Sequence, residues 1–138
     1  MDLGQVFTNK SVAQYMASLL NKKQCGTLLD PCFGAGVFID AALAQGFSNI
    51  VGYELDEALF DSVRKKYPNL ELNNQDFLKA STVNKFDAII MNPPYIRHEK
   101  IDDLKSLGIT KKNIRMSVTS KREVKSSNIS FFFFHCLY

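Results

Sequence analysis

The sequence predicts one α/β domain built on a Rossmann-like, doubly wound and mainly parallel sheet. Three observations support this prediction: short apolar strand segments alternate with helical segments, a glycine-rich turn follows the first strand, and a continuous apolar run forms the fourth. Of the 138 residues, 46% are hydrophobic and 22% are charged, as in a globular domain. We interpret the chain as ending after about four strands of a larger sheet, because open sheets of this kind usually contain more.

The first part of the chain is predicted to be a helix, then a strand, a tight turn and a second helix. Residues 8–11 offer side-chain oxygens that can cap a helix start. An apolar stripe at helical spacing follows, and we expect it to face inward. Its members are Val12, Tyr15, Met16, Leu19 and Leu20. Residues 27–30 are a buried-strand candidate, residues 31–36 form the turn, and residues 37–45 form a helix that stops at Gly46.

The next segments repeat this alternation. Residues 49–54 are predicted to be a strand and residues 56–67 a helix that Pro68 ends, with Leu59, Phe60 and Val63 facing inward. A short third strand begins at residues 70–72, and residues 86–91 form the fourth strand, apolar enough for a sheet covered on both faces.

We divide the chain into four predicted segments. They are an N-terminal motif and helix (1–24), a core (25–95), a basic variable loop (96–125) and the start of a buried helix (126–138). The last segment is apolar on every side, and we expect self-association through the phenylalanines at 131–134.

Composition excludes several classes of protein. The longest apolar runs are far shorter than the ~20 residues of a membrane span, and the N-terminus does not resemble a signal peptide. The three cysteines, Cys25, Cys32 and Cys136, include no C-x-x-C pair, so neither a disulfide framework nor a metal site is predicted. We therefore expect a cytoplasmic protein without a membrane partner.

Positive charge is concentrated in residues 96–125, which hold nine Lys and Arg against four Asp and Glu. This stretch is either a solvated loop or a patch that meets a polyanion, and composition leaves both interpretations open. As a patch it would contact nucleic acid through Arg97, Lys100, Lys111, Lys112 and Arg115.

The glycine turn at residues 30–38 has the sequence Asp-Pro-Cys-Phe-Gly-Ala-Gly-Val-Phe. Gly34 and Gly36 allow the backbone to approach a ligand that lies across the strand tips. The dinucleotide motif does not fit, because Ile39 occupies its third glycine position, and no Gly-Lys-Ser/Thr of a phosphate loop follows. A tight turn without a ligand is the alternative.

Two acidic residues follow the next strands. Glu54 ends the second strand, 18 residues after Gly36, where a carboxylate can accept hydrogen bonds from both ribose hydroxyls. With the glycine turn, it indicates a cofactor that contains a nucleoside. Asp76 could accept a bond from an adenine amino group while Phe77 covers the ring, although the segment alone also suits an ordinary loop.

The most specific signal is Asn92-Pro93-Pro94-Tyr95, directly after the fourth strand. The two prolines fix the backbone and remove two N–H donors, which leaves rigid carbonyl acceptors. Asn92 adds an amide oxygen and Tyr95 adds a stacking face. Such a group of acceptors beside an aromatic ring suits a planar amine.

In chain order these segments resemble the S-adenosylmethionine-dependent adenine-N6 DNA methyltransferases of restriction–modification systems. The resemblance covers roughly residues 1–100 and includes Gly-Gln-Val-Phe-Thr at 4–8. It implies a sheet of the class I methyltransferase type and S-adenosyl-L-methionine as cofactor. The family normally has proline where this chain has Asn9, and the family's target-recognition domain is absent from these residues.

The resemblance also implies a set of site residues. Phe7, Thr8 and Asp30 would line the methionine end of the cofactor, Glu54 would bind the ribose, and Asp76 and Phe77 would bind the adenine. The full cofactor set implied by the resemblance is Phe7, Thr8, Asp30, Pro31, Gly34, Gly36, Phe38, Glu54, Leu55, Asp76, Phe77 and Asn92. Residues Asn92, Pro93, Pro94 and Tyr95 would act on an adenine flipped out of double-stranded DNA.

Three alternatives stay open at this point. Asn-Pro-Pro-Tyr also occurs in glutamine-N5 protein methyltransferases and in ribosomal guanine-N2 methyltransferases. The chain could also be a non-catalytic fragment that binds the cofactor. As a fragment it is expected to have little activity on DNA, and weak, salt-sensitive DNA binding. The resemblance further implies a cognate restriction endonuclease as a possible partner.

Overall fold

The computed structural model describes residues 7–21, 26–80 and 86–93. The chain divides into two compact units, and Phe7–Asn92 forms the unit described below. The predictions for the basic stretch at 96–125, the aromatic run at 131–134, and residues Pro94 and Tyr95 fall outside the described residues. Within the residues that are described, no helix has the length and apolar character needed to cross a membrane.

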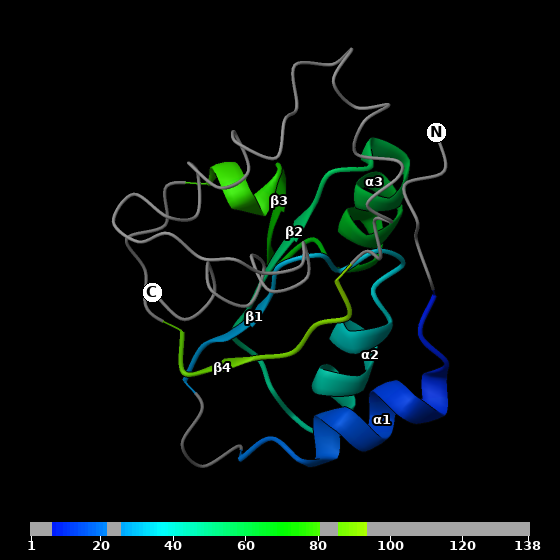
Figure 1. The fold of residues 1–138 in the computed structure, drawn as a ribbon, viewed down its shortest axis with the longest axis vertical. Helices are drawn as coiled ribbons and strands as arrows, with labels where there is room; N and C mark the ends of the chain where they lie inside the picture. The colour runs from blue at the N-terminus through cyan, green and yellow to red at the C-terminus, as the bar shows by residue number, and fades with distance from the viewer. Residues whose placement is uncertain (1–6, 22–25, 81–85, 94–138) are drawn as a thin grey trace, which may run out of the picture. The chain divides into compact units, whose positions relative to one another are not determined.

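A parallel sheet of four strands in the order β3-β2-β1-β4 forms the centre of this unit (Figure 1). The strands are β1 (Leu28–Asp30), β2 (Ile50–Glu54), β3 (Glu71–Asn74) and β4 (Ala88–Ile89). The helices are α1 (Lys10–Ser18), α2 (Val37–Ala44) and α3 (Glu57–Lys66), with a short 3₁₀ turn at Phe77–Lys79. The predicted Rossmann-like, doubly wound fold is confirmed.

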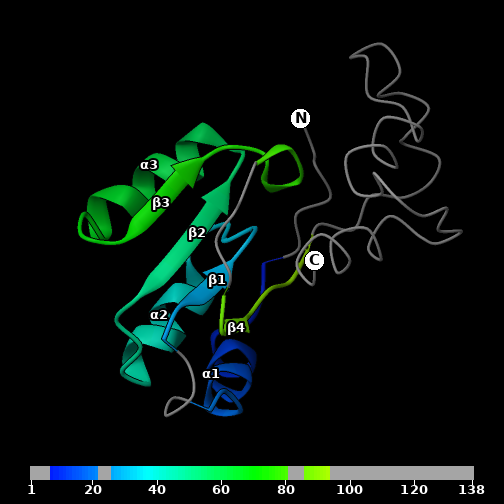
Figure 2. The same cartoon turned by 90° about the vertical axis from the view of Figure 1, so that its left-hand side faces the viewer.

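The strand order reverses beside β1. The chain moves from β1 to β2 and then to β3, and returns to pair β4 with the opposite edge of β1 (Figure 2). In open α/β sheets, ligands bind outside the carboxyl ends of the strands at this reversal. Asp30 ends β1 and Asn92 follows β4, so two predicted site residues lie at this position.

Local signals in the sequence set the helix boundaries. The Asn9 side chain caps α1 by accepting a bond from the Ser11 N–H at 2.8 Å, which confirms the predicted start. Gly36 precedes α2 with φ of 81°, a conformation that favours glycine. Asp56 caps α3 by accepting a bond from the Leu59 N–H at 3.1 Å. The Asn9 and Asp56 side chains satisfy N–H groups that have no partner inside the helices, whereas Gly36 makes no side-chain cap bond.

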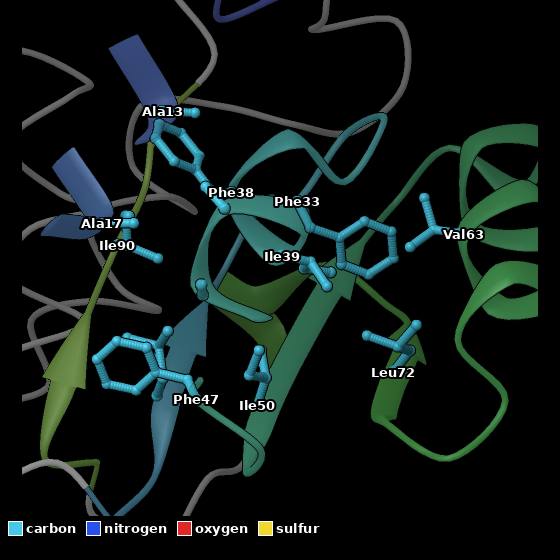
Figure 3. Close-up of a cluster of buried hydrophobic side chains, with 13 residues drawn as sticks. Ala13, Ala17, Phe33, Phe38, Ile39, Phe47, Ile50, Val63, Leu72 and Ile90 are labelled. Carbon is cyan, nitrogen blue, oxygen red and sulfur yellow. The ribbon is translucent and has the colours of Figure 1, made fainter. Parts of the chain in front are cut away.

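A hydrophobic core lies between the helices and the sheet (Figure 3). Gly52 of β2 makes room for it, because a Cβ there would lie 2.7 Å from the Phe33 ring and 2.9 Å from Leu72. The buried cluster contains Ala13, Ala17, Leu28, Phe33, Phe38, Ile39, Ala41, Ala42, Phe47, Ile50, Val63, Leu72 and Ile90. This packing fixes the turn after β1 against the sheet.

The predicted inward stripe of α1 is partly wrong. Met16 and Leu20 pack against the core as expected, but Val12, Tyr15 and Leu19 are 50%, 66% and 67% exposed. The buried residues of α1 are instead Ala13 and Ala17. Small side chains at a helix contact allow the two axes to approach closely, and α1 packs on α2 through these alanines (Figure 3).

The fourth strand is shorter than the predicted residues 86–91. Only Ala88–Ile89 is extended sheet, and both residues are half-buried rather than fully covered. The register pairs Leu28 with Ala88 and Leu29 with Ile89, and the next backbone bond runs from the Ile90 N–H to Leu29 O at 2.9 Å. The Asp87 side chain accepts bonds from the Gly26 and Thr27 N–H groups where the pairing begins.

Candidate active site

The glycine turn at the end of β1 is anchored to β2 and leaves space on one side. The Phe33 N–H donates to Tyr53 O at 3.0 Å, and the Gly36 N–H donates to Phe33 O at 2.8 Å. A Cβ at Gly34 would meet no atom within 4 Å, whereas a Cβ at Gly36 would lie 3.1 Å from Val63. Gly34 therefore faces open space where a ligand can approach. Gly36 instead allows Val63 of α3 to pack closely against the turn.

Glu54 ends β2, as predicted, and its side chain holds the glycine turn. One carboxylate oxygen accepts a bond from the Gly34 N–H at 2.8 Å, and the other accepts one from the Asp56 N–H at 2.8 Å. The residue is only 8% exposed. A carboxylate has about four acceptor sites, so these two bonds leave capacity for ribose hydroxyls.

Asp30 is completely buried at the carboxyl end of β1. Its Oδ1 accepts a bond from the Cys32 N–H at 3.3 Å, while Oδ2 has no hydrogen-bond partner among the described residues. Burial, with a smaller effect from the charge of Glu54, raises the pKa of Asp30 to about 8. A buried oxygen without a partner suits a site that accepts a cationic or hydrogen-bonding ligand group.

Asn92 is brought against two other parts of the chain. Its Nδ2 donates to Thr8 Oγ1 at 3.0 Å, and its backbone oxygen accepts a bond from Cys32 Sγ at 3.6 Å. The segment before α1, the glycine turn and the residues after β4 therefore meet around Asn92. This gathers the predicted residues Thr8, Asp30 and Asn92 at one end of the sheet.

Four further predicted cofactor residues form two groups that differ in exposure. Phe38 and Phe77 are each 3% exposed, Phe38 in the core and Phe77 edge-on to Tyr53 with ring centroids 5.0 Å apart. Phe7 and Leu55 are 66% and 58% exposed. Apolar side chains that stay exposed beside Thr8 and Glu54 are available to a ligand, whereas the two buried rings pack inside the protein.

Asp76 and Pro31 complete the predicted cofactor residues. Asp76 caps the turn at Phe77–Lys79 by accepting a bond from the Leu78 N–H at 3.0 Å, and it is half-buried. Pro31 is buried in the turn after β1. Among the residues that the structure describes, no three His, Cys, Asp or Glu side chains are grouped as a metal site would require.

Sequence reasoning missed three contacts at this site. They are Cys32 to Asn92, Thr8 to Asn92, and Glu54 to the Gly34 N–H. The first two join residues 60 and 84 positions apart, so no local periodicity could reveal them. Spacing along the chain predicted the strand ends but not the side chains that meet there.

The parallel sheet and its helices have the Rossmann-like fold of the class I methyltransferases. The type I restriction-modification system methyltransferase subunit from Streptococcus thermophilus has a similar structure, with a TM-score of 0.62 and 25% identity. The comparison covers 98% of this chain and 32% of that one.

Sequence similarity assigns the chain to one family of methyltransferases. The chain belongs to the Eco57I restriction-modification methylase family, whose family model matches residues 38–138. It is 36% identical over 116 residues to the type II methyltransferase M.AccI from Acinetobacter calcoaceticus, which covers 80% of this chain and 22% of that protein. It is also 33% identical over 97 residues to ribosomal RNA small subunit methyltransferase A from Thermotoga neapolitana, which covers 67% and 37%. The chain therefore spans about a fifth of the length of M.AccI.

Proposed function

We propose that the protein carrying this sequence transfers a methyl group from S-adenosylmethionine to the N6 amino group of adenine in DNA. In this proposal it is the modification enzyme of a restriction–modification system. Membership of the Eco57I family and similarity to M.AccI support the proposal. The observation that carries it is the bond from Cys32 Sγ to the Asn92 backbone oxygen, because it holds the residue proposed to bind the amine beside the turn proposed to bind the nucleoside.

Three features of the chain fit this cofactor. Gly34 faces open space, Glu54 has acceptor capacity for the ribose, and Asp30 Oδ2 is buried with no hydrogen-bond partner among the described residues, which suits a donor group of the methionine end. When bound, S-adenosylmethionine supplies an electrophilic methyl group on a sulfonium centre. The exposed Phe7 and Leu55 would contact its apolar parts.

The acceptors around Asn92 would activate the target amine. The lone pair of an adenine amino group is delocalised into the ring, which makes the nitrogen a poor nucleophile. Hydrogen bonds from both N–H groups to the Asn92 amide oxygen and the Pro93 carbonyl favour the localised lone pair of the transition state. Tyr95 would stack on the flipped base and Pro94 would stiffen the segment. In this proposal, positioning of the amine against the methyl group contributes much of the rate.

The proposed substrate is double-stranded DNA with one adenine flipped into the site. Arg97, Lys100, Lys111, Lys112 and Arg115 are proposed to attract the phosphates, which contributes affinity without sequence information. A cognate restriction endonuclease and a cytoplasmic location belong to the same proposal.

RNA is the second candidate substrate. The observation that favours it is the 33% identity to ribosomal RNA small subunit methyltransferase A. Hydrogen-bond acceptors for a planar amine serve a base in either nucleic acid, so the site geometry does not select between them. Glutamine-N5 and guanine-N2 transfer use the same amine chemistry.

Radiolabelled S-adenosylmethionine tests the proposal. The full-length protein that contains this sequence is incubated with unmodified DNA, ribosomal RNA or a protein mixture, and label is counted in each. We expect label in DNA, and we expect Asn92→Ala to reduce it about 10²- to 10³-fold, as for loss of one preorganised transition-state contact. The matched control is Asn69→Ala, which changes an exposed asparagine in the turn before β3. Label confined to RNA or protein would overturn the proposal.

A further inference from the structure

We propose that Thr8 is a positioning residue that acts through Asn92, by holding the side-chain amide with its oxygen toward the reacting amine. The inference rests on the proposed function. It gives Thr8 a role other than contact with the methionine end of the cofactor.

The contact itself is a directed hydrogen bond. Asn92 Nδ2 donates to Thr8 Oγ1 at 3.0 Å, between residues 84 positions apart, and both residues are half-buried. An asparagine amide has a donor end and an acceptor end of nearly the same shape. In the observed bond the Thr8 hydroxyl oxygen accepts from Nδ2, so the amide nitrogen lies toward Thr8 and the amide oxygen points away from it.

Both partners of this bond are anchored. Thr8 directly precedes Asn9, whose carbonyl accepts the Ala13 N–H bond at 3.0 Å in the first turn of α1. Asn92 is held on its backbone side as well, because Cys32 Sγ donates to its carbonyl oxygen. The amide is therefore fixed from the segment before α1, and the main chain is fixed from the glycine turn.

Orientation of this amide matters for the chemistry. A flipped amide would present N–H donors to an amine that also donates, and that encounter is repulsive. With Thr8 accepting from Nδ2, the Asn92 amide oxygen is left to accept from the target amine. The amide is therefore already oriented before the substrate binds. Thr8 itself need not touch the substrate or the cofactor.

Two substitutions at Thr8 separate the hydroxyl from the shape of the side chain. Thr8→Val keeps the branched shape and removes the acceptor, whereas Thr8→Ser keeps the hydroxyl and removes a methyl group. In the full-length protein we expect Thr8→Val to lower kcat by about tenfold to a hundredfold. The cofactor Kd from calorimetry should stay within about twofold of the parent, since the lost bond is to Asn92 and not to the cofactor. Thr8→Ser should restore most of the rate.

The chain contains a matched control for the lost bond. Asn49 Nδ2 donates to Thr27 Oγ1 at 2.8 Å, the same pair of groups, at the amino end of β1 and β2. Thr27→Val removes that bond and should leave kcat at the parent value. In an Asn92→Ala background, Thr8→Val should cause no further loss, because the two residues act as one unit.

The outcomes distinguish this inference from the proposed function. If Asn92→Ala abolishes transfer while Thr8→Val reacts at the parent rate, the inference is wrong and the proposed function stands. A cofactor Kd that weakens as much as kcat falls would make Thr8 a cofactor ligand and would also overturn it. If Asn92→Ala reacts at the parent rate, the proposed function fails first.

The side-chain NH₂ resonances of Asn92 give a readout without catalysis, because Thr8→Val should shift them and Thr8→Ser should not.

Discussion

At the scale of single residues, the two carboxyl groups at the carboxyl ends of β1 and β2 have different environments. Glu54 accepts two backbone bonds that fix the glycine turn, whereas Asp30 is fully buried with one oxygen that has no partner among the described residues. The two acids therefore differ in environment: Glu54 holds the backbone of the turn, whereas burial raises the pKa of Asp30 to about 8.

The pKa of Asp30 makes folding stability depend on pH. Burial raises this pKa from 3.8 to about 8, so between these values the folded state holds a proton that the unfolded state has lost. The stabilisation is complete below pH 3.8 and is lost as the pH rises through about 8. The free energy of unfolding should therefore fall by up to about 1.4 kcal/mol per pH unit across this window.

Urea unfolding at pH 5, 6, 7 and 8 measures this slope. Asp30→Asn removes the titrating group and should flatten the curve. Asp61→Asn changes an exposed carboxylate on α3 and should keep the slope of the parent. An unchanged slope in Asp30→Asn would show that another group controls the dependence.

Glu54 should determine cofactor affinity more than any other acidic residue. Loss of a charged acceptor costs about 1.5–3 kcal/mol, so Glu54→Gln should weaken the cofactor Kd about tenfold or more. Glu57→Gln, an exposed change in the first turn of α3, is the control. Calorimetry of the folded variants measures both values, and an unchanged Kd in Glu54→Gln would remove Glu54 from the site.

At the scale of elements, the two glycines of the turn have different surroundings. Gly34 and Gly36 have φ of 54° and 81°, so a side chain at either position is strained by about 1–2 kcal/mol. Gly36 also lies where a Cβ would meet Val63 at 3.1 Å, while Gly34 faces open space. Gly36→Ala should therefore lower the free energy of unfolding more than Gly34→Ala.

Cofactor affinity should show the opposite order for the same two variants, Gly34→Ala and Gly36→Ala. The methyl group of Gly34→Ala would occupy the space that faces the cofactor, so its loss of affinity should exceed that of Gly36→Ala. Denaturant unfolding and calorimetry on both variants test this. If the two variants lose equal stability and equal cofactor affinity, then Gly36 is not specific to packing and Gly34 is not specific to ligand binding.

The elements themselves were largely predictable from the sequence, and the exceptions have physical causes. Asn9, Gly36 and Asp56 mark helix starts by local chemistry, so the predicted helix boundaries are close to those observed. The buried face of α1 was not predictable from hydrophobicity, because close packing on α2 selects Ala13 and Ala17 instead of larger side chains.

The third strand shows a second limit of sequence patterns. The predicted start at residues 70–72 agrees with the observed start at Glu71, but the strand also includes Asn74, which the sequence places after it. Polar Asn73 and Asn74 extend it because their side-chain amides donate to the carbonyl oxygens of Gly52 and Glu54 on β2. Such bonds depend on a neighbouring strand and leave no apolar pattern in the sequence.

At the scale of the whole molecule, positive charge lies after the site in the sequence, at residues 96–125. If the five proposed cations each neutralise a phosphate, the slope of log K against log salt for duplex DNA should be about −4.5. Replacing both Lys111 and Lys112 by Gln should make the slope less negative by about two. Lys65→Gln on α3 is the control, and an unchanged slope in the double variant would remove these lysines from the interface.

Identification of the methylated nucleoside tests the central claim most directly. Unmodified DNA is incubated with the full-length protein and S-adenosylmethionine, digested to nucleosides and analysed by mass spectrometry. We predict N6-methyladenine as the product, strongly reduced by Asn92→Ala and unaffected by Asn69→Ala. A methylated cytosine as the product, or DNA without any methylated base while RNA acquires one, would contradict the account.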